Sequence, residues 1–135
     1  MISGTCLCKK VQYEYSGAVG TITVCHCSDC RKAQGTVSVV AVPVETAKLH
    51  WISGQSEIKE YESSPGKKRA FCRCCGTPLY SRRDDVAHLL RLRIGSIDSS
   101  HELQPVAHIF TKDVPRWAQL DDDWPRYDRH EPARQ

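Results

Sequence analysis

Three cysteines within six residues constrain the fold of this chain more than any other feature. They lie in the segment Cys25-His26-Cys27-Ser28-Asp29-Cys30, with gaps of one and two residues. Thiolates are soft ligands, and a two-residue gap lets two cysteines bind one tetrahedral metal ion. A structural zinc site uses four protein ligands, whereas a catalytic site keeps one position open. The segment therefore predicts either a site that another residue completes or a three-ligand site that is open to substrate.

Two further groups of cysteines lie on either side of this central segment. Cys6 and Cys8 are near the start of the chain, and the gap from Cys72 to Cys75 is followed by Gly76. That second pattern is typical of a zinc knuckle, because glycine lets the chain turn sharply beside the sulfur atoms. Joining the two pairs predicts a closed structural zinc site with four thiolates. The alternative joins Cys72 and Cys75 to two cysteines of the central segment, which would leave Cys6 and Cys8 unused, so we disfavour it.

The favoured pairing leaves Cys25, Cys27 and Cys30 as the ligands of a second zinc ion with an open position. Three thiolates outweigh the charge of the dication, so this ion is a weak Lewis acid that readily accepts a further thiol and holds it as thiolate. A thiolate beside an aldehyde is the nucleophile that forms a thiohemiacetal, and placing the two together supplies much of the rate. These three cysteines are therefore the candidate catalytic residues.

Eight cysteines in one chain also raise the question of disulfides. The first residues contain no apolar targeting segment, and no apolar run is long enough to span a membrane. These features predict a soluble, cytoplasmic protein in a reducing compartment, where metal binding is favoured over disulfides. Cys74 is then a thiol outside both metal sites. A redox function that uses a disulfide between Cys74 and the adjacent Cys75 is the least favoured hypothesis, because that disulfide would be strained.

The 135 residues predict one mainly β domain. Short runs of β-branched and aromatic residues alternate with turn signals, and Val37 to Val44 is the best candidate for a central strand. The predicted strands are Thr5 to Cys8, Val11 to Tyr15, Thr21 to Val24, Val37 to Val44, Leu49 to Ile52, Glu57 to Glu62, Ala70 to Phe71, Pro78 to Ser81, one or two between Leu89 and Ile97, and Val106 to Phe110.

Three other segments differ from this pattern. A short helical turn, capped by Ser28 or Asp29, is predicted to end at Gly35. Residues 63–69 are predicted to form a flexible basic loop. We expect a domain over residues 2–118, with Trp117 packed against it, and a partly loose C-terminal extension over residues 119–135.

The charge of the chain bears on its partners. The formal net charge is +3, which is too small and too scattered to indicate a nucleic-acid surface. Basic residues that can attract a carboxylate are Arg31, Lys32, Lys67, Lys68 and Arg69. His26 is expected to support the neighbouring ligands, and His88, His101 and His108 to be structural or exposed, because none has metal-ligand spacing.

At its cysteine motifs the chain resembles the glutathione-dependent formaldehyde-activating enzyme family, which includes the centromere protein V domain. The likeness runs from about Ile2 to Trp117, and its departures are Lys9, where the family usually has glycine, and the additional Cys74. The stretches that carry it are Gly4-Thr5-Cys6-Leu7-Cys8, Cys25-His26-Cys27-Ser28-Asp29-Cys30-Arg31, Phe71-Cys72-Arg73-Cys74-Cys75-Gly76-Thr77-Pro78-Leu79, His108-Ile109-Phe110 and Pro115-Arg116-Trp117.

The resemblance implies a β-tent fold, in which layered antiparallel sheets are held together by zinc. It implies a structural zinc at Cys6, Cys8, Cys72 and Cys75 and a second zinc at Cys25, Cys27 and Cys30. The implied activity is that of a carbon–sulfur lyase: glutathione adds to formaldehyde to give S-hydroxymethylglutathione. The alternative is a non-catalytic zinc module of the centromere protein V type that binds a protein or nucleic acid, in which the second site is closed.

Overall fold

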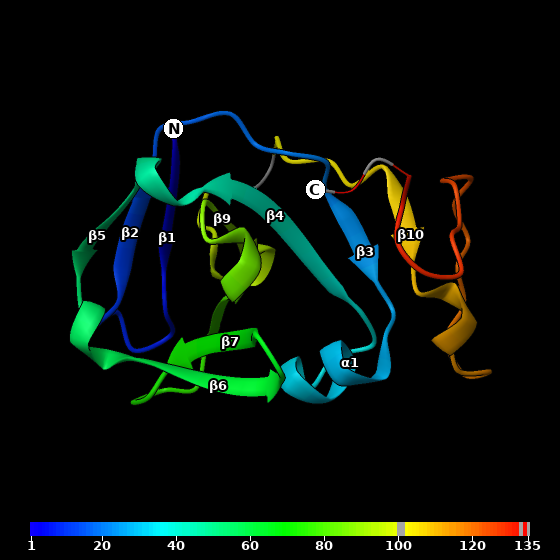
Figure 1. Cartoon of the computed structure of the whole chain (residues 1–135), viewed down its shortest axis with the longest axis horizontal. Helices are drawn as coiled ribbons and strands as arrows, with labels where there is room; N and C mark the ends of the chain where they lie inside the picture. The colour runs from blue at the N-terminus through cyan, green and yellow to red at the C-terminus, as the bar shows by residue number, and fades with distance from the viewer. Residues whose placement is uncertain (100–101, 133, 135) are drawn as a thin grey trace.

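Two β-sheets of unequal size form the protein (Figure 1). The structure, a computed structural model, describes residues 1–99, 102–132 and 134. Its strands are β1 (Ile2–Thr5), β2 (Gln12–Tyr15), β3 (Thr23–Cys25), β4 (Val39–Glu45), β5 (Leu49–Ser53), β6 (Ile58–Ser64), β7 (Lys67–Cys72), β8 (Pro78–Arg83), β9 (Leu89–Arg93) and β10 (Ala107–Ile109). The prediction of a mainly β, layered fold is confirmed.

The smaller sheet has the strand order β1-β2-β5, and the larger sheet has the order β10-β3-β4-β9-β8-β7-β6. Neighbouring strands are antiparallel, except that β10 runs parallel to β3. Figure 1 shows the smaller sheet at one end of the molecule and β3 and β10 at the other, with β4 crossing between them. β4 pairs with β3 on one side and β9 on the other, which confirms the predicted central strand.

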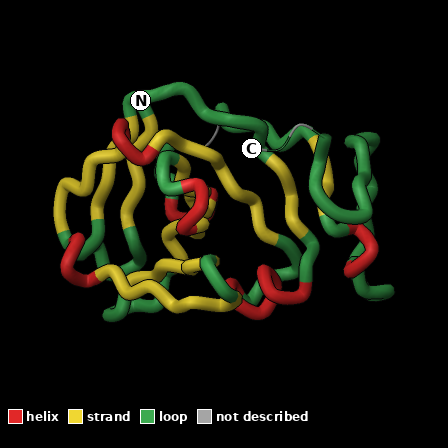
Figure 2. The backbone as a smooth tube through the Cα atoms, viewed as in Figure 1, coloured by secondary structure: helices red, strands yellow, loops and turns green. Residues whose placement is uncertain are grey.

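Helical segments are short, and all but the last of those described lie between strands (Figure 2). The single α-helix of the described residues is α1 (Ser28–Gln34), which begins after Cys27 and contains Cys30. The other segments are 3-10 turns: η1 (Thr46–Lys48), η2 (Gln55–Glu57), η3 (Asp84–Val86), η4 (Ile94–Ser96) and η5 (Thr111–Asp113). No helix within the described ranges is long and apolar enough to cross a membrane.

The main core contains inward-facing side chains of both sheets. Tyr13 and Tyr15 are buried while Gln12 and Glu14 are exposed, which is the predicted alternation. Val42 and Val44 pack in the same core, and burying each such side chain contributes roughly 1.5–3 kcal/mol. A second, smaller core surrounds the central cysteines. The site described below is therefore built into a packed part of the fold.

Two predicted boundaries in the first half of the chain are wrong. β1 ends at Thr5, so Cys6 and Cys8 lie in a turn rather than on a strand. Residues 63–69 are not a flexible loop: β6 continues to Ser64, and β7 begins at Lys67. The polar composition of this segment indicated a loop, but only Pro65-Gly66 forms a turn, in which Gly66 has φ +78°. The polar residues on either side belong to the paired strands.

The C-terminal part also differs from expectation. Trp117 is 66% exposed, so the prediction that it packs against the domain is wrong. Residues 125–129 run beside β10: the Tyr127 N–H donates to His108 O at 2.9 Å, and the His108 N–H donates to Pro125 O at 2.8 Å. Phe110 likewise donates to Arg129. The domain boundary at residue 118 stays a prediction, and His101 lies outside the described residues.

Candidate metal centre

Four cysteine sulfurs from distant parts of the chain meet where β1 and β7 end. They belong to Cys6, Cys8, Cys72 and Cys75, and all four lie within 4.8 Å of one another. The Sγ atoms of Cys6 and Cys8 are 3.6 Å apart, and those of Cys8 and Cys72 are 3.8 Å apart. The structure thus brings together the four residues that the spacing paired.

Local backbone geometry aims these sulfurs at one point. After Cys72 the chain turns through Gly76, which has φ +79° and donates its N–H to Cys72 O at 2.7 Å. The first pair turns through Lys9, which has φ +68° and donates to Cys6 O at 2.9 Å. The N–H of Val11 donates to Cys6 Sγ at 3.3 Å. Lys9 therefore adopts the conformation for which glycine is normally used.

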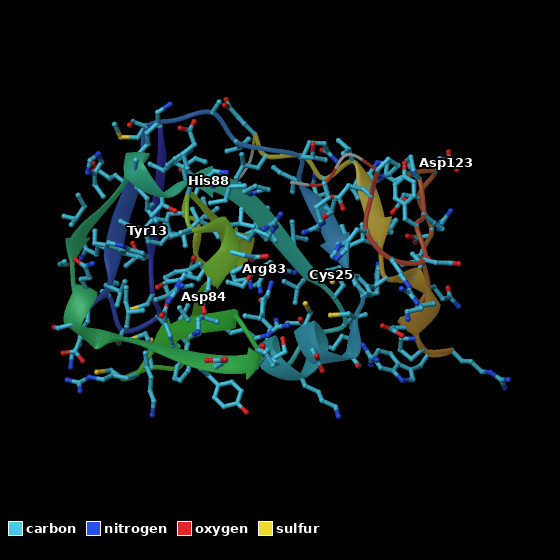
Figure 3. All side chains as sticks on the ribbon, in the orientation of Figure 1. Tyr13, Cys25, Arg83, Asp84, His88 and Asp123 are labelled. Atoms are coloured by element: carbon cyan, nitrogen blue, oxygen red, sulfur yellow. The ribbon has the colours of Figure 1, made fainter. Side chains whose placement is uncertain are left out.

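The second cluster lies at the junction of β3 and α1, where Figure 3 shows sulfur atoms gathered beside Cys25. It contains Cys25, Cys27 and Cys30, whose sulfurs also lie within 4.8 Å of one another. Cys25 is the last residue of β3 and Cys30 lies in the first turn of α1. Cys25 Sγ and Cys30 Sγ are 3.5 Å apart. The short connection between strand and helix is what folds three sulfurs together.

The cap of α1 involves a cluster residue. The N-cap is Cys27, whose Sγ accepts the Cys30 N–H at 3.2 Å, so the expected caps Ser28 and Asp29 are wrong. The helix ends at Gly35, as predicted, with φ +67° and its N–H bonded to Arg31 O. An N–H donor at the Cys27 sulfur favours the thiolate form that a metal requires.

Both clusters fit a tetrahedral zinc ion. With Zn–S bonds of about 2.3 Å, tetrahedral geometry places neighbouring sulfurs about 3.8 Å apart. The sulfur–sulfur distances of 3.6 and 3.8 Å in the first cluster and 3.5 Å in the second are close to that value. Either cluster can therefore hold one metal ion, and Cys ligands favour zinc.

The two clusters differ in their surroundings. Cys72 is fully buried and belongs to the main core. Cys25 and Cys30 belong to the smaller core, which Val39 and Ile109 complete. Half-buried Phe110 and Tyr127 pack at its edge. The three-cysteine cluster therefore has an apolar wall to which the C-terminal segment contributes.

A row of three side chains adjoins the three-cysteine cluster. His26 Nε2 lies 2.8 Å from His108 Nδ1, and His108 Nε2 lies 2.8 Å from Asp122 Oδ2. Burial lowers the pKa of His26, so its ring is neutral at pH 7. The Asp122 carboxylate accepts from His108 Nε2–H, and His108 Nδ1 shares one hydrogen bond with His26 Nε2. The His26 ring is thus hydrogen-bonded to His108, and its expected role in supporting the neighbouring ligands stays a prediction. Sequence reasoning missed Asp122.

The five basic residues that were expected to attract a carboxylate lie in different surroundings. Arg69 Nη1 donates to Cys30 Sγ at 3.5 Å. Lys68 lies on the same strand but pairs with Glu62 and Asp84 at 3.1 Å and 3.0 Å. Arg31 donates to the backbone O of Asp113, and Lys32 is exposed. Of the five candidates, Arg69 is the one whose side chain contacts a cluster sulfur among the described residues.

Cys74 is exposed and belongs to neither cluster. Its Sγ lies 3.2 Å from Glu57 Oε2, and Lys10 Nζ lies 3.5 Å from the same sulfur. Arg73 and Cys74 both donate to Glu57, which lowers the pKa of that carboxyl to about 2. All eight cysteines are free thiols, so neither a disulfide framework nor a bridge from Cys74 is formed.

Comparisons with known proteins agree with these motifs. The family model described as glutathione-dependent formaldehyde-activating enzyme matches residues 1–113. A curated relative from Schizosaccharomyces pombe, named an uncharacterized lyase, is 30% identical over 77 residues, or 57% of this chain and 54% of the relative. The chain therefore spans about half the length of this curated relative.

A similar fold is found in a crystal structure of a Rhodobacter sphaeroides protein. The TM-score is 0.61 at 19% identity, and the match covers 93% of this chain and 98% of that one. Because the family model matches most of the chain, including both cysteine clusters, the chain belongs to the glutathione-dependent formaldehyde-activating enzyme family.

Proposed function

We propose that this protein is a zinc-dependent carbon–sulfur lyase that forms or cleaves an adduct between a thiol and an aldehyde, such as S-hydroxymethylglutathione. One observation carries the proposal: the cluster of Cys25, Cys27 and Cys30 offers three ligands, and no other His, Cys, Asp or Glu of the described residues joins it. The other cluster has four. A three-ligand zinc site leaves a position for a substrate, which is the arrangement of catalytic zinc sites.

A zinc ion bound by these three thiolates would accept a thiol and hold it as thiolate at neutral pH. In the reaction a bond forms between sulfur and the carbonyl carbon, and the π bond of the carbonyl breaks. The thiol proton ends on the new hydroxyl group, so no oxidant or reductant is needed. Glutathione and formaldehyde, the substrates in the family's name, fit this reaction class.

The residues of this chain would assist in two ways. Arg69 donates to Cys30 Sγ, which withdraws charge from that ligand and offsets the net negative charge of three thiolates around a dication. The apolar wall of Val39 and Ile109 limits water around the cluster, which strengthens the electrostatic interactions inside it. Holding both reactants in this confined space supplies the rate advantage of proximity.

Replacing Cys27 with serine tests the proposal while preserving the helix. Cys27 caps α1 through its sulfur, and a serine hydroxyl caps at least as well, so Cys27→Ser removes a ligand without removing the cap. We expect the variant to lose about one zinc per chain and its acceleration of adduct formation. Metal content by elemental analysis and exchange rates by NMR with glutathione and formaldehyde measure both effects.

The matched control is Cys74→Ser, the same chemical change at an exposed cysteine outside both clusters. It should keep both zinc ions and full activity. If Cys27→Ser lost a zinc ion but turned over thiol and aldehyde at the wild-type rate, the proposed function would be wrong.

A further inference from the structure

Three cations converge on the three-cysteine cluster from the larger sheet. Lys67 and Arg69 are alternate residues of β7, so their side chains share one face of the sheet. Arg93 ends β9 and is only 6% exposed. Arg69 contacts Cys30 Sγ at 3.5 Å, and Arg69 and Arg93 line the same small cavity as Cys30. The cluster therefore has a positively charged wall.

These cations lack carboxylate partners. Within residues 1–99, 102–132 and 134, no Asp or Glu forms an ion pair with Lys67, Arg69 or Arg93, whereas the neighbouring Lys68 has two such partners. Burial, with the nearby Arg93 and Arg69 charges, lowers the pKa of Lys67 to about 8. Arg69 donates to Ser63 Oγ at 2.9 Å and to Cys30 Sγ, whereas Arg93 is buried. Burying a charge without an opposite charge is costly, so proteins retain such a group where a ligand compensates it.

Unpartnered polar atoms lie in the same wall. Ser81 stands between Arg69 and Arg91 in the register of β7, β8 and β9, is 1% exposed, and its Oγ has no hydrogen-bond partner. Gln34 Oε1, which is also buried without a partner, belongs to a residue that lines the cavity beside Cys30. That cavity has a volume of about 20 Å³, which holds about one water molecule. Buried polar atoms of this kind require a polar partner, which is either an ordered water or a ligand group.

The balance of charges around the cluster indicates that the ligand group is an anion. Three thiolates around a divalent ion leave one negative charge, which offsets one of the three cations. A bound thiolate offsets a second cation. The third requires another anion, and a guanidinium beside the cluster favours a carboxylate, which it can bind through two parallel hydrogen bonds.

We infer that Lys67, Arg69 and Arg93 form an anion subsite that binds the carboxylate of the thiol substrate, so that the protein selects short acidic thiols over neutral ones. This inference rests on the proposed function and deepens it by naming the class of thiol. Because the cations lie beside the cluster itself, the carboxylate is only a few bonds from the sulfur. Arg91, in the same row, faces Glu131 of the C-terminal segment and is left out of the subsite.

Two thiols of equal length test the subsite. 3-Mercaptopropionate and 3-mercaptopropanol differ only in the carboxylate, and their binding to the purified zinc protein is measured by calorimetry. We expect the acid to bind about 10- to 100-fold more tightly, the value of one charge-assisted hydrogen-bonded contact. Propionate, which has the carboxylate without the thiol, should bind far more weakly than 3-mercaptopropionate.

Lys67→Met and Arg93→Met should each reduce the preference for the acid and leave the affinity for 3-mercaptopropanol unchanged. Lys68→Met is the matched control, because this adjacent lysine points to the opposite face. It should keep the full preference. Lys67 is the safer variant if Arg93→Met does not fold, because its side chain is only partly buried.

Equal affinity of wild-type protein for the two thiols would overturn the subsite and leave the proposed function standing. Propionate binding as tightly as 3-mercaptopropionate would show a site for free anions and overturn the link to the thiol. Binding of neither thiol would overturn the proposed function and the inference together.

Discussion

Lys9 occupies a turn position whose backbone conformation is unfavourable for a lysine. It has φ +68° between Cys8 and the start of β2, a conformation that costs a residue with a Cβ roughly 1–2 kcal/mol. We expect Lys9→Gly to relieve this strain, partly offset by the greater freedom of glycine in the unfolded chain, and to stabilise the protein by about 0.5–1 kcal/mol. Urea unfolding of the zinc-bound protein measures the change.

Lys10→Gly is the control for Lys9→Gly, because Lys10 has no positive φ. The same substitution there should destabilise the protein slightly, since glycine then adds only unfolded-state freedom. A loss of stability in Lys9→Gly as large as in Lys10→Gly would contradict the idea that the turn is strained.

At the residue scale, the cysteine motifs were predictable and their surroundings were not. The gap between Cys72 and Cys75 has a fixed chemical meaning, so spacing alone indicated which cysteines meet. Arg93 carries no such signal, because it belongs to an ordinary apolar strand pattern. Its position beside Cys30 depends on how β7 and β9 lie around β8, which is a tertiary property. Asp122 is one of three consecutive aspartates, and only the fold distinguishes it.

At the scale of elements, β6 and β8 are joined across β7 by charged side chains. Glu60, Ala70 and Tyr80 are in register on adjacent strands, and small Ala70 leaves room for the outer two to meet. Tyr80 donates to Glu60 at 2.7 Å, and Arg82 contacts both Glu60 oxygens at 2.7 and 2.8 Å. The hairpin that composition indicated as a loop is thereby part of a firmly bonded sheet.

We expect Glu60→Gln to destabilise the protein by about 1 kcal/mol at pH 7, because a charged, two-point contact becomes a neutral one. Hydrogen bonds from Arg82 hold the pKa of Glu60 below its usual value. This contribution is therefore fully present above about pH 4.5 and is lost as the pH falls below it. Unfolding at pH 7 and pH 3 should show the difference between wild type and variant shrinking on acidification.

Glu62→Gln, on the same strand, serves as the control. Glu62 is half exposed and contacts Lys68 through one oxygen at 3.1 Å, so its replacement should cost less than that of Glu60. A Glu60→Gln effect that is the same at both pH values would show that the carboxylate charge is not its source.

At the scale of the whole molecule, the two clusters connect different parts of the chain. The four-cysteine cluster joins the turn after β1 to the turn after β7, and Cys72 is part of the main core between the sheets. The three-cysteine cluster joins only β3 to the helix that follows it. A metal ion that closes a long loop constrains the unfolded chain more than one that closes a short loop. We therefore expect a metal ion at the first site to stabilise the fold more than one at the second, which agrees with the catalytic role proposed for the second site.

Removing a ligand from each cluster tests this expectation. We expect Cys72→Ser to lose one zinc ion and to lower Tm by more than about 10 °C, because structural zinc contributes several kcal/mol and each kcal/mol corresponds to roughly 2–4 °C in a domain of about this size. Cys30→Ser should also lose one zinc ion but lower Tm by less than half as much. Calorimetry with metal analysis measures both, and Cys74→Ser controls for the loss of a thiol. Equal shifts in Tm for the two variants would contradict this expectation, since the three-cysteine cluster would then support the fold as much as the other.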